Sequence, residues 1–386
     1  MEAANIIAAN TEQAGIQTFP AFCDVHVHFR EPGGSHKETI ATGCAAAARG
    51  GYTTVCTMPN VEPVPDTLEH LKAQTDIIAA DATIDVFPYA SITVAQKGEQ
   101  LVDMQALAPH VIAFSDDGHG IQDAEVMRSA FIAAKAVGKI IVAHCEDNSL
   151  LHGGYIHDGA YARTHGHKGI CSESEWCPIQ RDLELCAQTG AAYHVCHIST
   201  KESVELIRAA KKDGIDVTCE TAPHYLVLDE SCLQEDGRFK MNPPLRTAED
   251  RAELIRGIQD GTIDIIATDH APHTASEKSR GLANSPFGVV GLETAFPVLF
   301  TKLVREGAIS LDRLVELLSA NPQKRFGIAG NGGTCTWDLS ACYTIDSRSF
   351  ASMGRATPFE GMDVYGTCLQ TTMGNRVVYK RSEQAG

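Results

Sequence analysis

Short apolar runs alternate with longer amphipathic stretches along most of the chain. Continuous apolar runs bounded by Gly, Pro or Asn are typical of strands buried on both faces, whereas apolar positions three or four residues apart indicate helices. Eight strand–helix units follow one another, and this series predicts a parallel sheet closed into a (β/α)8 TIM barrel. We expect strands over 22–28, 52–58, 84–90, 111–115, 139–143, 191–196, 216–220 and 262–268, and helices over 38–49, 66–80, 98–107, 123–137, 172–189, 200–214, 247–259, 291–305 and 310–320.

The chain divides into three parts on this interpretation. Residues 21–325 form the catalytic barrel, in which Asp66 caps the second helix and 148–171 is a long loop. Residues 326–386 contain Gly-rich punctuation and short β-prone segments, which predict a small, reduced β appendage too short for a core of its own. Residues 1–20 are an N-terminal extension, expected to be a remnant of the same appendage.

Histidine and aspartate gather where the expected strands end. In a barrel the carboxyl ends of all strands share one rim, so residues far apart in sequence come together there. Ordinary loop starts would give mixed Ser, Lys, Glu and Gln at these points. The concentration of imidazole and carboxylate instead favours a metal site, with these candidates: His26, His28, Asn60, Asp116 or Asp117, His144, His197 and Asp269.

The pair His26 and His28 would begin that site. Alternate residues of a strand point to the same side, so both imidazoles can hold one metal ion. Four histidines and two carboxylates exceed what one tetrahedral zinc uses, and they suit two metals that share a bridging carboxylate. Such metals lower the pKa of bound water and polarise a carbonyl, which predicts hydrolysis, or the reverse condensation, of an amide-like bond. Asp269, at the end of the last strand, is the expected proton carrier.

The composition of the chain excludes some classes of binding partner and indicates where the protein is located. A formal net charge of −17 argues against nucleic acid or an anionic membrane as a ligand. No apolar run approaches the roughly 18 residues of a membrane span, and residues 1–10 show no signal-peptide pattern. The thirteen cysteines without CxxC pairs are expected to be reduced thiols, so we expect a cytoplasmic protein. The histidines of 148–171, namely His152, His157, His165 and His167, are expected to be solvated.

Seven segments in order resemble bacterial type I dihydroorotase, of the amidohydrolase superfamily. They are His26-Val-His28-Phe-Arg30-Glu-Pro-Gly, Met58-Pro-Asn60, Phe114-Ser-Asp-Asp117-Gly, Ala143-His144-Cys-Glu-Asp147, His194-Val-Cys-His197-Ile-Ser-Thr200, Met241-Asn242-Pro-Pro244 and Ala267-Thr-Asp269-His-Ala-Pro-His273. The resemblance covers about 19–327. It implies zinc-dependent, reversible cyclisation of N-carbamoyl-L-aspartate to L-dihydroorotate in pyrimidine (UMP) biosynthesis.

The resemblance also implies a role for each matching residue. His26 and His28 would hold one Zn²⁺ and His144 and His197 another, with Asp117 rather than Asp116 between them and Asp269 as ligand and general acid/base. The substrate, and above all its carboxylates, would contact Arg30, Asn60, Asn242, His273 and the backbone of Phe287 and Gly288. Arg30 suits a carboxylate because its guanidinium forms a fork of donors, and it supplies positive charge that the composition lacks.

Two alternatives stay open at this point. Hydantoinases and allantoinases share the pattern but bridge their metals with a carbamylated lysine at the end of strand four, and 111–117 contains no lysine. A non-catalytic partner of aspartate transcarbamoylase would be expected to lack metal ligands, and all are present. The sequence does not decide between one and two metals, nor whether the chain forms a homodimer or docks on aspartate transcarbamoylase. We expect 274–287 to be the loop that covers the substrate.

Overall fold

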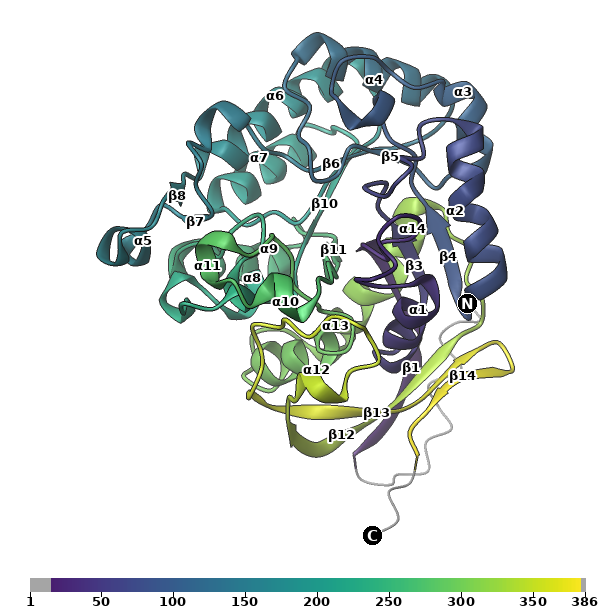
Figure 1. Cartoon of the computed structure of the whole chain (residues 1–386), viewed down its shortest axis with the longest axis vertical. Helices are drawn as coiled ribbons and strands as arrows, with labels where there is room; N and C mark the ends of the chain where they lie inside the picture. Colours follow the sequence, from purple (N-terminus) through teal and green to yellow (C-terminus); the bar gives the residue numbers. More distant parts are fainter. Residues whose placement is uncertain (1–14, 383–386) are drawn as a thin grey trace.

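The computed structural model describes residues 15–382 of the 386-residue chain. Eight parallel strands surround its centre (Figure 1). They are β2 (Phe22–Val27), β3 (Tyr52–Thr57), β4 (Asp85–Pro88), β5 (Phe114–Ser115), β6 (Ile141–Ala143), β9 (Tyr193–Val195), β10 (Val217–Thr221) and β11 (Ile265–Ile266). Three of them pair in the order β2-β3-β4 and five in the order β11-β10-β9-β6-β5. Parallel bridges from Ala90 to Phe114 and from Val27 to His270 join the two sheets into a ring, which confirms the expected barrel.

Helices cover the outside of this ring (Figure 1). Several of them begin where a side chain accepts a hydrogen bond from an N–H of the first turn, as at Thr39, Asp123 and Thr200. Their bounds are α1 Ile40–Arg49, α2 Leu68–Asp81, α3 Met104–Leu107, α4 Ala124–Ala136, α6 Glu173–Thr189, α7 Lys201–Lys212, α8 Pro223–Val227, α9 Ala248–Asp260, α10 Ala275–Lys278, α11 Gly281–Asn284, α12 Ala295–Leu299, α13 Leu311–Leu318 and α14 Ala320–Phe326, with a π-helical turn over Phe300–Val304.

A second hydrophobic cluster contains several small buried side chains. It brings together Cys23, Cys56, Ala113, Val142 and Cys196, which come from or adjoin strands around much of the ring. These three cysteines are buried and unpaired, so they pack as small apolar residues, as expected for reduced thiols.

The C-terminal segment and one strand that precedes the barrel form a four-stranded antiparallel sheet, drawn below the barrel in Figure 1. Strand β1 (Ile16–Pro20) pairs with β12 (Thr334–Thr344), which is followed by β13 (Asp363–Met373) and β14 (Arg376–Lys380). Trp337 lies 4.3 Å from Phe296 and 6.2 Å from Phe22, measured between ring centroids, so this sheet and the barrel share one core. The division at 20/21 and 325/326 stays a prediction, and residues 1–14 of the expected extension lie outside the described residues.

Four local predictions were wrong, two near the second and third expected helices and two within 148–171. Thr67, not Asp66, caps α2, because the Asp66 carboxylate is taken by the His70 ring and the Ala95 N–H. The helix expected over 98–107 shrinks to α3.

The expected loop 148–171 contains a parallel strand pair, β7 (Ile156–His157) and β8 (Gly169–Ile170), and a projecting helix α5 (Ala160–His165) (Figure 1). His157 is buried, not solvated, because the Arg246 guanidinium lies 3.3 Å from its Nδ1 and also donates to the Ile170 carbonyl of β8 at 2.9 Å. Within residues 15–382, none of the helices is both long and apolar enough to traverse a bilayer.

Candidate active site

A cavity of about 220 Å³ opens at the carboxyl ends of the barrel strands. Every predicted site residue except His26 lines it, and His26 is fully buried in contact with the lining residue Asp117. The lining residues are His28, Arg30, Asn60, Asp117, Gly118, His144, His197, Asn242, Asp269, Ala271, His273, Phe287 and Gly288. The structure therefore brings together side chains from seven separate strand ends and loops.

Asp117 lies at the centre of the four histidines. Its Oδ1 is 3.3 Å from His26 Nε2, 3.5 Å from His197 Nε2 and 3.9 Å from His144 Nδ1. Its Oδ2 is 3.5 Å from His28 Nε2. Burial alone would raise the pKa of Asp117, but His26 and His197 outweigh burial and hold that pKa well below its ordinary value. An ionised carboxylate in this position can face two cations at once.

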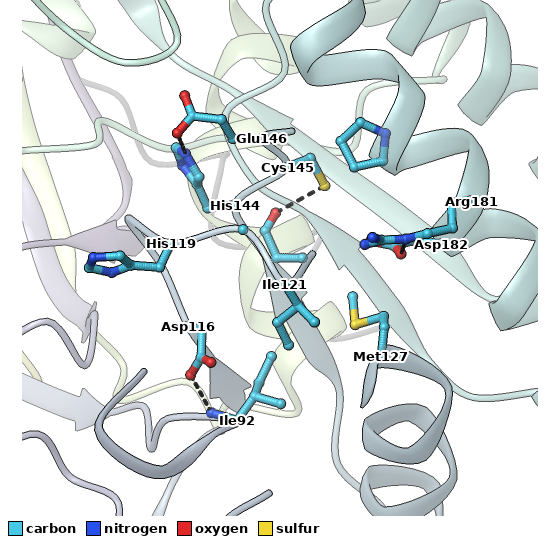
Figure 2. A pocket seen from close by; sticks show the side chains of 13 residues that line it. Ile92, Asp116, His119, Ile121, Met127, His144, Cys145, Glu146, Arg181 and Asp182 are labelled. Atoms are coloured by element: carbon cyan, nitrogen blue, oxygen red, sulfur yellow. Dashed lines mark hydrogen bonds and ion pairs between the residues drawn. The ribbon is translucent and has the colours of Figure 1, made fainter. Parts of the chain in front are cut away.

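Asp116 points away from this centre. Its carboxylate accepts hydrogen bonds from the N–H groups of Ile92 (2.7 Å) and Thr93 (3.1 Å) and from the Thr93 hydroxyl. Figure 2 shows Asp116 joined to Ile92 at the edge of a small neighbouring cavity of about 10 Å³, the size of one water. Both oxygens of Asp116 are therefore occupied by the loop at Ile92 and Thr93. Of the two adjacent carboxylates, Asp117 is the one that faces the histidines.

His26 in β2 and His28 just after it are each held in one tautomer by a hydrogen bond at Nδ1. His26 Nδ1 lies 2.6 Å from Glu220 Oε1, and His28 Nδ1 lies 2.8 Å from Asn60 Oδ1. Both acceptors are oxygens, so each Nδ1 carries the proton and each Nε2 is left to face Asp117 and Asp269. Asn60, expected to contact substrate, thus also orients a histidine.

The donor set fits a divalent metal ion. His26 Nε2 and Asp117 Oδ1 are buried and make no hydrogen bond within residues 15–382, although they face each other. Ligand atoms of His26, Asp117 and His197 lie within 4.8 Å of one another, as do those of His26, His28 and Asp269. Asp117 and Glu220 outweigh burial and raise the pKa of His26 well above its ordinary value, because these carboxylates favour a cation at Nε2, which is a proton when no metal ion is bound. Imidazole and carboxylate are ligands for borderline ions such as Zn²⁺.

Asp269 faces both this centre and the cavity. Its Oδ1 is 3.1 Å from His28 Nε2 and 3.6 Å from His26 Nε2. His28 and His26 outweigh burial and lower the pKa of Asp269, so the carboxylate is ionised. Asp269 has φ 49°, His197 φ 29° and Arg30 φ 57°. These left-handed backbone positions are costly for residues other than glycine, and they gather at this rim.

Arg30 and His273 form the opposite wall. The His273 Nε2–H donates to the Phe287 carbonyl at 2.7 Å, so Nδ1 is free to accept from Lys37 Nζ at 3.3 Å. Burial, with Arg30 and Lys37 nearby, lowers the pKa of His273 to about 3. Burial also lowers the pKa of Arg30 to about 10, which still leaves the guanidinium charged near neutral pH. This wall presents a cation and a neutral imidazole to the cavity.

The remaining predicted contacts complete the lining. Asn242 Nδ2 donates to Glu146 Oε1 at 2.7 Å, and Glu146 Oε2 lies 3.8 Å from His144 Nε2; Figure 2 shows the latter pair. Gly288 has φ 124°, and a Cβ there would lie 2.7 Å from the Ala271 carbonyl oxygen. Only glycine therefore fits this point of the cavity wall.

Sequence reasoning missed Glu220 and Glu146. Glu220 ends the seventh expected strand, and its Oε2 also contacts His194 Nε2 at 3.2 Å. A carboxylate at the end of an otherwise buried strand was the available signal. Glu146 follows His144 by two residues and could have been noticed as its neighbour on the same side.

A parallel eight-stranded barrel with imidazoles and carboxylates around a buried centre is the arrangement of a metal-dependent hydrolase. The Dihydro-orotase-like family profile matches residues 16–203. Curated relatives include the dihydroorotases of Shouchella clausii (51% identical, 96% of this chain and 89% of the relative), Anoxybacillus flavithermus (50%, 94% and 87%) and Bacillus subtilis (48%, 95% and 88%). The chain belongs to the dihydroorotase family.

Solved structures with a related fold include a hydantoinase and a dihydropyrimidinase. An L-hydantoinase (dihydropyrimidinase) from Arthrobacter aurescens superposes with a TM-score of 0.84 at 25% identity, over 95% of this chain and 86% of that one. A dihydropyrimidinase from Brevibacillus agri gives 0.82 at 23%, over 95% and 85%. The fold is shared with these enzymes, whereas the sequence is about twice as similar to the dihydroorotases.

Proposed function

We propose that this chain is a zinc-dependent dihydroorotase that interconverts L-dihydroorotate and N-carbamoyl-L-aspartate in pyrimidine (UMP) biosynthesis. The observation that carries the proposal is the pairing of two walls in one cavity. One wall is the cluster of histidines around Asp117, and the other is Arg30 with neutral His273. The first suits hydrolysis of an amide, and the second suits a substrate carboxylate in a chain whose net charge is −17.

We assign the metal ligands as His26, His28, His144, His197, Asp117 and Asp269, holding one or two Zn²⁺. When bound, zinc supplies Lewis acidity that polarises a carbonyl and lowers the pKa of water. Glu220 and Asn60 hold the two histidines of β2 in the tautomer that leaves Nε2 for a ligand bond. Asp117 supplies the negative charge between the two sides of the site.

We assign proton transfer to Asp269. In hydrolysis the water oxygen bonds to the ring amide carbon, and Asp269 takes the proton from that water. The carbon–nitrogen bond then breaks, and Asp269 returns the proton to the leaving nitrogen. Ring closure is the same path reversed. The ionised state of Asp269 fits the accepting step.

We assign substrate positioning to Arg30, Asn60, Asn242, His273 and the backbone of Phe287 and Gly288. Arg30 Nε donates to the Pro272 carbonyl at 3.2 Å, which holds the guanidinium so that its remaining donors can meet a carboxylate. His273 Nδ1 faces Lys37, and its proton on Nε2 holds Phe287. Asn242 keeps its side-chain oxygen for the substrate because its nitrogen donates to Glu146.

A hydantoinase or allantoinase activity is the second candidate, favoured by the shared fold. It is less supported, because residues 111–117 contain no lysine to be carbamylated and Asp117 occupies the centre. A non-catalytic partner of aspartate transcarbamoylase would have no need for this intact ligand set.

The deciding assay compares hydrolysis of L-dihydroorotate, hydantoin and allantoin by one preparation purified without chelator. We expect turnover of dihydroorotate in excess over the other two, with bound zinc or a similar divalent ion. Preference for hydantoin would replace the proposal, and a folded protein without metal would end the mechanism. Three further measurements address the proposed partners and location. Light scattering on the same sample tests for a homodimer, and co-elution tests association with aspartate transcarbamoylase. Fractionation of cells tests the proposed cytoplasmic location.

A further inference from the structure

Lys278 is a buried lysine whose Nζ meets three backbone carbonyls. Only 6% of the residue is exposed. Its Nζ donates to the carbonyls of Gly288 at 2.7 Å, Pro286 at 2.9 Å and Lys240 at 3.1 Å. A lysine ammonium has three N–H donors and no acceptor, so these carbonyls satisfy it completely. The Lys278 Nζ therefore connects two chain segments through hydrogen bonds: the segment at Lys240 and the segment at Pro286–Gly288.

Those two segments form one wall of the cavity. Phe287 and Gly288 line it, and so does Asn242, two residues after Lys240. The Gly288 N–H donates to the Lys240 carbonyl at 3.1 Å, which ties the segments to each other. The Phe287 carbonyl accepts the His273 proton. Displacement of the Phe287–Gly288 backbone would therefore also break the hydrogen bond from His273 Nε2–H that fixes the tautomer of His273.

Lys240 fastens the same wall from the other side. It too is buried, and its Nζ donates to the Ala283 carbonyl at 2.9 Å. The ammonium lies 4.7 Å from the centre of the Phe287 ring, within the range of a cation–π contact. Ala283 belongs to helix α11, Lys278 ends helix α10, and Phe287 follows them in the chain. The segment 274–288 is thus attached at its middle and at its end.

We propose that Lys278 is a positioning residue for the reaction: it holds the Phe287–Gly288 backbone, and through it His273, at the place where the substrate binds. The inference rests on the proposed function and deepens it. It assigns 274–288 as a fastened wall rather than a loop that swings over the substrate. Lys278 does not touch the substrate, so its loss acts on binding and on the order of the wall, leaving the metal ligands in place.

The test replaces Lys278 by methionine, which keeps the length and apolar volume of the side chain and removes the donors. We expect the KM for dihydroorotate to rise at least about tenfold, as for loss of buried hydrogen bonds to a charged group, with kcat changed much less and bound metal per chain unchanged. Amide hydrogen exchange over 279–290 should speed up by a similar factor. The matched control is Lys302→Met, because Lys302 is partly exposed and pairs with Glu306; KM and exchange should stay at parent values.

A KM within twofold of the parent in folded Lys278→Met overturns the proposal. Should that variant fail to fold, Lys240→Met, which removes the contact to Phe287 and the bond to Ala283, is expected to raise KM in the same way, and an unchanged KM there also overturns it. Failure of the proposed function is read separately, because it appears as absent dihydroorotate turnover in the parent protein. Hydrogen exchange over 279–290 still reports on Lys278 in that case, and equal exchange in parent and variant refutes the fastening.

Discussion

Replacing Glu220 by glutamine tests how far the proposed metal centre depends on residues that hydrogen-bond to its proposed ligands. Glu220 is fully buried, and its two oxygens meet two imidazoles, His26 Nδ1 at 2.6 Å and His194 Nε2 at 3.2 Å. Burial alone would raise its pKa, but His26 and His194 outweigh burial and lower that pKa to about 2. The group is therefore a carboxylate throughout the working range, and it can accept from both rings at once.

Glutamine can accept from only one of the two rings. Its NH₂ group must face the other imidazole nitrogen, which either loses its hydrogen bond or changes tautomer. A buried hydrogen bond to a charged group contributes about 1.5–3 kcal/mol, which corresponds to roughly 10–100-fold in a binding constant. Loss of a carboxylate behind a ligating histidine costs a similar 10–100-fold in metal affinity. We therefore expect Glu220→Gln to bind Zn²⁺ about 10–100-fold more weakly.

The measurement is a titration of metal-free protein with Zn²⁺ against a chromophoric chelator of known affinity. Glu125→Gln is the matched control, because the Glu125 side chain is 78% exposed and pairs loosely with Arg128 at 3.4 Å. Circular dichroism of the metal-free variants separates weaker binding from unfolding. If folded Glu220→Gln binds zinc within twofold of the parent, the tautomer of His26 is not set by Glu220 and the reasoning is refuted.

Three further outcomes follow from the same geometry. Asp269→Asn should lower kcat by at least about 10²-fold with the fold kept, measured by dihydroorotate hydrolysis; retained turnover would remove Asp269 as the proton carrier. Arg30→Met should raise KM about tenfold or more, because a charge-assisted bond to a carboxylate is lost, and an unchanged KM contradicts that role. His273 has a pKa of 6.5 unfolded and about 3 folded, so the unfolded chain binds more protons between these values. Stability should fall as pH drops from 6.5 towards 3, and urea titrations should show less of this loss in His273→Gln, or the pKa assignment is wrong.

The barrel and the rim could be predicted because both depend on local signals. Buried parallel strands are continuous apolar runs, and residues such as His144, His197 and Asp269 follow those runs directly. Once eight units are counted, closure of the ring places their ends together. The structure indeed places these three side chains in one cavity. The folding of 148–171 into β7, α5 and β8 could not be predicted this way, because its two-residue strands are too short to show a period.

The choice between Asp116 and Asp117 marks the limit of the residue pattern. The two are adjacent, equally polar and both buried, so neither composition nor spacing separates them. Their difference arises from tertiary contacts: the N–H groups of Ile92 and Thr93 capture Asp116. The family resemblance favoured Asp117, and the contact geometry gives the physical reason.

Glu220 and Lys278 lie beyond local signals for a related reason. A buried charge is tolerated only where the fold supplies its partners, and here the partners come from distant parts of the chain. Glu220 meets His26, 194 residues away in sequence, and Lys278 meets the Lys240 carbonyl, 38 residues away. In the sequence alone, Glu220 is an ordinary polar residue near the end of a strand, and Lys278 is an ordinary polar residue in a short helix. An unpartnered charge in these places would cost several kcal/mol, so each of these residues depends on partners that only the folded chain supplies. The residues proposed to hold the site in shape are therefore identified from the packing, whereas those that line the cavity could be expected from the sequence.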